Sequence, residues 1–98
     1  MRNIDRDPEG ERRSQIELLK IDLDKEGWIE EKMKMGSKES RYKEMGAIEI
    51  EVEAFNTELA RFMYDSNFLN EQMYEVARAE LQGKRRDLIG KIRKYTSS

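Results

Sequence analysis

The sequence predicts an all-α fold, a three-helix bundle whose second and third helices form an antiparallel hairpin with coiled-coil-like packing. Apolar residues recur at helical spacing over residues 45–62 and again over residues 74–95. The single proline, Pro8, follows a helix-capping residue and marks the start of the first helix. With 98 residues the chain forms one domain at most, spanning 1–98, and residues 1–7 and 96–98 are expected to be disordered tails.

The first helix is expected to run from about residue 8 to residue 34. Asp7 is a candidate N-cap, Pro8 suits the first helical position, and Glu9 adds an acid to the first turn. Gly27 interrupts the apolar pattern, so a kink or short break is expected there. The apolar residues on either side follow spacings of three and four: Ile16, Leu19, Leu23, Ile29 and Met33. Residues 35–40, which contain Gly36 and two serines, form the connection to the next helix.

The second helix carries the most regular pattern in the chain. Its apolar residues are spaced 3, 4, 3, 4, 3 and form what we call the heptad seam: Met45, Ile48, Val52, Phe55, Leu59 and Phe62. A strand is the alternative for residues 47–53, because residues 48–53 alternate strictly between apolar and acidic, as residues 19–24 also nearly do. Glu is a poor strand former and no hairpin turn flanks either run, so we prefer helix.

A turn at Asp65, Ser66 and Asn67 is expected to separate the second helix from the third. The third helix should run from about residue 68 to residue 95. One side of it carries an apolar stripe: Tyr74, Ala77, Leu81, Leu88, Ile92 and Tyr95. Gly83 and Gly90 lie inside this helix, and each should weaken it by about 1 kcal/mol relative to Ala.

The heptad seam is predicted to be a self-association surface. The first helix offers few apolar residues to cover it, and each large side chain left exposed forgoes roughly 1.5–3 kcal/mol of burial free energy. A two-fold interface would cover the seam on both copies at once, so we expect a homodimer.

The composition excludes most enzyme classes. The chain has no Cys and no His, which removes disulfides, thiol chemistry, zinc sites built on sulfur or imidazole, and histidine bases. We therefore expect no catalytic residue, no metal and no cofactor. The segment from Asp22 to Ile29 resembles the first eight positions of an EF-hand calcium loop, but Met33 stands where the closing Glu would bind, so no calcium site is predicted.

Charge is segregated along the chain although the net charge is only -2. Residues 81–98 hold six basic residues and one acid, whereas residues 44–80 hold nine acids and two arginines. An antiparallel hairpin would bring the two regions together, with Glu49 beside Lys84. The basic helix could also bind an anion, and the lone tryptophan could anchor a partner. The candidate contacts are therefore Arg85, Arg86, Arg93, Lys94 and Trp28.

Small size and patterned charge predict a non-enzymatic protein–protein interaction module, acting as an adaptor, inhibitor or regulatory subunit on another protein. This character is typical of small accessory proteins of phages and mobile elements. The alternative is binding of nucleic acid or of an anionic small molecule such as a nucleotide through the basic helix. Residues 1–10 lack the apolar stretch of a signal peptide and no run is long enough to span a membrane, so a cytoplasmic location without membrane contact is expected.

Overall fold

The computed structural model describes residues 8–36 and 39–96, and these residues form helices and connecting segments without any strand. The all-α prediction is therefore confirmed, including helix rather than strand at residues 47–53. The elements in chain order are α1 (Pro8–Glu17), α2 (Trp28–Met33), α3 (Ser40–Asp65), a short 3₁₀ helix η1 (Ser66–Phe68) and α4 (Glu71–Thr96).

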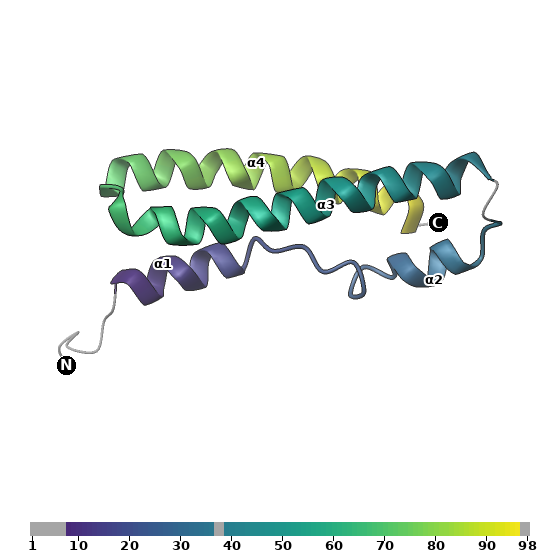
Figure 1. The fold of residues 1–98 in the computed structure, drawn as a ribbon, viewed down its shortest axis with the longest axis horizontal. Helices are drawn as coiled ribbons and strands as arrows, with labels where there is room; N and C mark the ends of the chain where they lie inside the picture. The colour runs from purple at the N-terminus through teal and green to yellow at the C-terminus, as the bar shows by residue number, and fades with distance from the viewer. Residues whose placement is uncertain (1–7, 37–38, 97–98) are drawn as a thin grey trace.

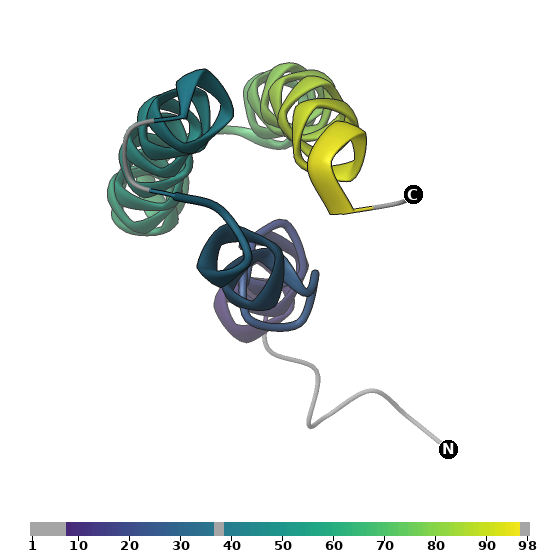
Figure 2. The same ribbon diagram turned by 90° about the vertical axis from the view of Figure 1, so that its right-hand side faces the viewer.

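The two long helices, α3 and α4, lie side by side and run antiparallel, as the hairpin prediction requires (Figure 1). The N-terminal arm, which we define as residues 8–36, contains α1 and α2 and runs along this hairpin. Seen end-on, α3, α4 and the arm occupy the three corners of a triangle (Figure 2). The bundle thus has three layers, one of which is only partly helical.

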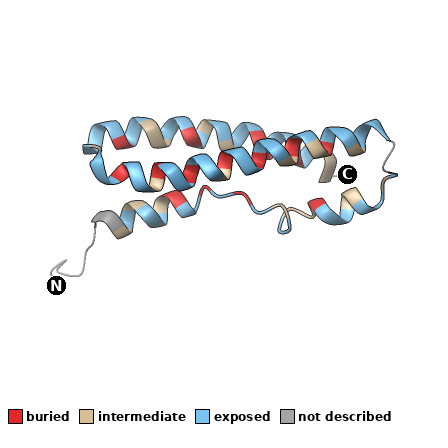
Figure 3. Cartoon of the chain, viewed as in Figure 1, coloured by how far each residue is buried: buried red, intermediate tan, exposed pale blue. Residues whose placement is uncertain are grey.

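Buried side chains lie where the three layers face one another, and the outward faces are exposed (Figure 3). From α3 the core receives the whole heptad seam. The arm and α4 add nine more buried apolar residues: Ile16, Leu19, Ile21, Trp28, Tyr74, Leu81, Leu88, Ile89 and Ile92. No helix within the described residues is both long and apolar enough to cross a membrane.

The prediction for the first helix is wrong in its middle part. Helix α1 ends at Glu17 and α2 begins at Trp28, so residues 18–27 follow a non-helical path where only a kink was expected. Gly27 adopts a φ of 76°, in the left-handed region that glycine tolerates best, and immediately precedes α2. This glycine therefore directs the chain into a separate helix.

The alternation at residues 19–24 belongs to an irregular connection, with turns on either side of residues 20–22, and not to a sheet strand. Leu19 and Ile21 are both buried while the residue between them is exposed. The side chain of Asn56 in α3 takes the place of a neighbouring strand. Its Oδ1 accepts a hydrogen bond from the Ile21 N–H (3.0 Å), and its Nδ2 donates to the Ile21 carbonyl (2.9 Å).

The hairpin turn is longer than predicted, because η1 is followed by two further residues before α4 begins at Glu71. Asn70 caps this helix, since its Oδ1 accepts a hydrogen bond from the Met73 N–H (2.8 Å). Thr96, expected in the C-terminal tail, belongs to the last turn of α4. The remaining expected tail residues, 1–7 and 97–98, lie outside the described residues.

The ion pairs between α3 and α4 correct the predicted register. Lys84 pairs with Glu58 and Lys91 pairs with Glu51, each at 3.0 Å, whereas Glu49 was expected beside Lys84. Because α4 starts late, its residues face positions nearer the C-terminal end of α3 than expected. The acidic and basic regions do meet within the hairpin, but through different partners.

Polar contacts also fasten the arm to the hairpin near the turn. Arg12 donates hydrogen bonds to the carbonyls of Ser66 and Leu69, and its guanidinium lies over the ring of Tyr74. The Tyr74 hydroxyl donates to the side-chain oxygen of Gln15 (2.6 Å). The first helix is therefore held against the same turn that joins α3 to α4.

Candidate interaction site

All six residues of the heptad seam lie in the core of a single chain. None is more than 9% exposed, and they pack against both α4 and the arm. The expected shortage of covering residues is wrong, because Ile21, Trp28 and Ile89 also contribute to this core. The seam is not a free surface, and the reason for expecting a homodimer through it no longer holds.

Trp28 is not an exposed anchor, because its side chain is fully buried. Its indole N–H donates to Glu49 Oε2 (2.8 Å), and its ring meets that of Tyr95 nearly at right angles with centroids 5.9 Å apart. Lys32 donates to both oxygens of the same carboxylate (2.8 and 2.9 Å). The cluster of Trp28, Lys32 and Glu49 joins α2 to α3 and to the end of α4, so its role is structural.

Two tyrosines at the ends of the hairpin have a raised pKa. The Tyr95 hydroxyl donates a hydrogen bond to Glu44, and this contact, aided by burial, raises the pKa of Tyr95. Burial raises the pKa of Tyr74, and the positive charge of Arg78 offsets only part of that effect. Both hydroxyls therefore stay protonated at neutral pH and act as hydrogen-bond donors.

Glu49 gives the stability of the protein a dependence on pH. Burial alone would raise the pKa of this carboxyl, but hydrogen bonds from Lys32 and Trp28 and the charge of Lys32 outweigh burial and hold the pKa below its ordinary value of 4.5. A carboxyl whose pKa is lowered by folding stabilises the folded state above its unfolded pKa. The contribution is therefore complete at neutral pH and is lost as the pH falls from about 4.5 through the lowered pKa.

Urea unfolding at a series of pH values should measure this loss, with the helical circular dichroism signal as the readout. Glu49→Gln should be less stable at neutral pH and should show a flatter dependence below about pH 4.5, because its amide does not titrate. A variant with the same dependence as the natural protein would show that another carboxyl is responsible.

The four basic candidates of α4 differ in their surroundings. Arg85 points to the arm, where its Nε donates to the Leu19 carbonyl (3.0 Å). Arg86 and Arg93 line a shallow groove with Arg85, whereas Lys94 is exposed outside that groove. Lys84 and Lys91 of the same helix form ion pairs with acids of α3, so part of the positive charge of α4 is compensated within the chain.

The exposed face of α3 carries a second heptad-spaced series that the sequence-based prediction missed. Each member follows a heptad-seam residue by two positions, which is about 200° further round the helix and therefore away from the core. We call this series the outer seam: Ala47, Ile50, Ala54, Thr57, Arg61 and Tyr64. All six residues are exposed, Ile50 to 70% and Tyr64 to 67%.

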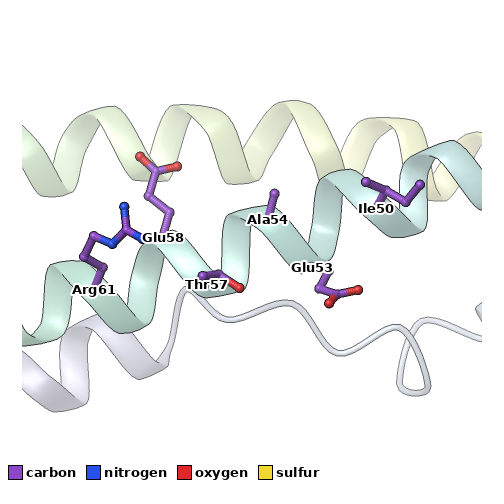
Figure 4. Close-up of a pocket in the computed structure, with 6 residues that line it drawn as sticks. All are labelled: Ile50, Glu53, Ala54, Thr57, Glu58 and Arg61. Carbon is purple, nitrogen blue, oxygen red and sulfur yellow. The ribbon is translucent and has the colours of Figure 1, made fainter.

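A shallow groove follows the middle of the outer seam, and its lining residues are Ile50, Glu53, Ala54, Thr57, Glu58 and Arg61 (Figure 4). Glu58 extends towards α4 and Glu53 towards the arm, so small side chains lie between two acidic edges. The distance between packed helices depends on the side chains at the contact, and small residues permit a close approach. The groove is shallow, with small side chains at its centre.

The charged residues along the groove differ in whether they form ion pairs within the chain. On the edge nearer α4, Glu51 and Glu58 each hold a lysine of that helix. Within residues 8–36 and 39–96, Glu53 and Arg61 form neither an ion pair nor a side-chain hydrogen bond. These two opposite charges are therefore available to a partner.

The apolar series continues to the hairpin turn. Phe68, four residues after Tyr64, is 74% exposed, and the two ring centroids lie 5.5 Å apart. A signal for this face was present in the sequence, because Ile50 belongs both to the alternating run and to the second heptad series. Two seams offset by two residues produce that alternation on one helix, with Ile48 and Val52 directed inwards and Ile50 outwards.

No group of three acidic side chains within the described residues is placed to hold a metal ion, and this includes the segment that resembles a calcium loop. Comparison of the chain with protein-family models, with curated proteins and with solved structures gives no match. A function must therefore be argued from the chemistry of the surface.

Proposed function

We propose that the protein is a non-enzymatic interaction module that binds an α-helix of a protein partner along the outer seam. One observation carries the proposal: α3 has two heptad-spaced seams, and only one of them is used in the core. A module of this kind acts as an adaptor, inhibitor or regulatory subunit, because it changes its partner by occupying part of the partner's surface.

The properties of the outer seam suit a helix as the bound element. Helices recognise one another through anchors at positions i, i+3, i+4 and i+7, and the outer seam repeats this spacing. Full burial of Ile50 or Tyr64 would contribute roughly 1.5–3 kcal/mol each. The small residues Ala54 and Thr57 between them would let two helix axes approach to about 8–10 Å.

Binding of nucleic acid or of an anionic small molecule has less support. Arg85, Arg93 and two lysines of α4 already make contacts within the chain, so much of the positive charge in and around the shallow groove lined by Arg86 is engaged. Phosphate binding in that groove would weaken steeply as salt is added, whereas helix docking on the outer seam would depend mainly on apolar contact.

Site-specific photo-crosslinking in cells that produce the protein tests the proposal. A photoreactive side chain in place of Ile50 should give protein adducts whose attachment sites map to one face of a helix, and Ala54→Glu in the same chain should abolish them. The same photoreactive group in place of Glu80, an exposed residue of α4, serves as the control. Equal adducts from both positions, or nucleic-acid adducts that require Arg86 and Arg93, would contradict the proposal.

A further inference from the structure

We propose that the helix bound by the outer seam is α3 of a second copy of this chain, lying antiparallel across a two-fold axis between Ala54 and Thr57. This inference rests on the proposed function and names the partner. The self-association surface then lies on the side of α3 opposite the heptad seam, which is buried within one chain.

The sizes of the outer-seam residues fit an antiparallel pair. A two-fold axis between Ala54 and Thr57 sets each of these small residues against the other in the partner copy, so the helices approach most closely at the centre. Further out, the large Tyr64 meets the small Ala47 of the second copy, and the aliphatic stem of Arg61 meets Ile50. Large residues therefore face small or flexible ones at every level.

Charge selects the direction of the pair. In the antiparallel arrangement, positions 61 and 53 of the two copies lie within one helical turn of each other along the helix axis, and the two-fold axis repeats this approach. A parallel arrangement would place Arg61 against Arg61 and would bring Glu53 to the edge of the second copy that carries Glu51 and Glu58. On the edge nearer α4, Glu51 and Glu58 each form an ion pair with a lysine of their own chain. These ion pairs reduce the repulsion between the carboxylates of the two copies on that edge.

The expected dimer is weak and reversible. The outer seam from Ala47 to Tyr64 is about 25 Å long at 1.5 Å per residue, and a contact of one helix with another buries less area than a standard protein interface. We expect an affinity in the micromolar range, so that the pair forms and separates with concentration.

Opposite charge changes in the full chain test the proposed contact. Glu53→Lys sets two positive charges against each other at both ends of the pair, and Arg61→Glu sets two negative charges against each other. Each variant alone should dimerise at least about tenfold more weakly than the natural protein. An equimolar mixture of the two variants should pair again, because the introduced lysine meets the introduced glutamate and the unchanged Arg61 meets the unchanged Glu53.

Sedimentation velocity over a concentration series, from about 10 μM to about 500 μM, provides the measurement. Glu80→Lys is the matched control, because it makes the same charge change on an exposed position of α4 and should pair like the natural protein. Recovery in the mixture excludes misfolding as the cause of a loss. A natural protein that sediments as one chain throughout, or a mixture that stays monomeric, would overturn the inference.

The absence of cysteine permits a test of direction. Ala47→Cys and Tyr64→Cys should be joined by a short bis-maleimide only when the two variants are mixed, because positions 47 and 64 lie about 25 Å apart along the helix. Crosslinking of each variant to itself would indicate a parallel pair and contradict the inference. If the natural protein stays monomeric but position 50 crosslinks to a helix of another protein, the inference fails and the proposed function stands.

Discussion

Replacing Phe55 with Glu should unfold the protein. Phe55 is only 4% exposed, in the middle of the heptad seam, where all neighbours named in the core are apolar or aromatic. An unpaired carboxylate in such surroundings costs several kcal/mol, which is comparable with the whole stability of about 5–15 kcal/mol expected for a small domain. Far-UV circular dichroism at neutral pH should show loss of most of the helical signal.

Ile50→Glu is the matched control, because it makes a similar change on the opposite face of the same helix. Ile50 is 70% exposed, so the change in the free energy of unfolding should stay within about 0.5 kcal/mol. Binding along the outer seam should nevertheless be lost. If Phe55→Glu folded as well as Ile50→Glu, the heptad seam would not be the core. If both unfolded, the outer seam would be needed for folding itself.

Trp28→Ala should cause the second large loss of stability. The indole is fully buried, donates a hydrogen bond to Glu49 and packs edge-on against Tyr95, so truncation leaves a cavity and removes a contact at the junction of α2, α3 and α4. Removing a buried aromatic side chain costs about 3–5 kcal/mol. In a chain of this size the melting temperature should fall by more than about 10 °C.

Ile29→Ala provides the comparison for this loss, because Ile29 follows Trp28 in α2 but is 50% exposed. It should lower the stability only slightly, and urea unfolding of both variants would measure the difference. A loss below about 1 kcal/mol for Trp28→Ala would mean that α2 does not stay packed on the hairpin in solution.

Periodicity alone predicted the two long helices, because α3 and α4 each keep an apolar stripe for many turns. The heptad seam and the stripe from Tyr74 to Ile92 are the faces that the structure buries. Such patterns are reliable when a long helix packs along its whole length, since the same period is then repeated against one surface.

The arm could not be predicted in the same way. The segment around Leu19 and Ile21 is an irregular connection with turns on either side, and Asn56, which is distant in sequence, satisfies the backbone of Ile21. A pattern within the segment carries no information about that side chain. The late start of α4 shifted the register for a similar reason, because η1 and Asn70 lengthened a turn that the sequence placed at residues 65–67.

The self-association surface was predicted on the heptad seam, which the structure buries within one chain. Counting only the expected stripes left the heptad seam without enough cover, because Ile21 and Trp28 were not counted in the arm and Ile89 was not counted in α4. With these three residues in the core, the exposed surface of α3 lies on the side of Ile50 and Tyr64. The arm forms a third layer that buries the heptad seam, and the periodicity of α3 alone carries no information about that layer.

The contacts that hold the arm join residues far apart in sequence, with separations of 35 residues for Ile21 and Asn56 and 66 residues for Leu19 and Arg85. The entropy lost on closing a flexible loop grows only with the logarithm of its length, by roughly 0.6 kcal/mol per doubling, so whichever contact forms first carries a similar cost. Every later contact then closes a much shorter loop. We therefore expect the arm to dock on the hairpin as one unit, because the helices of the hairpin are neighbours in sequence and offer a formed surface to it.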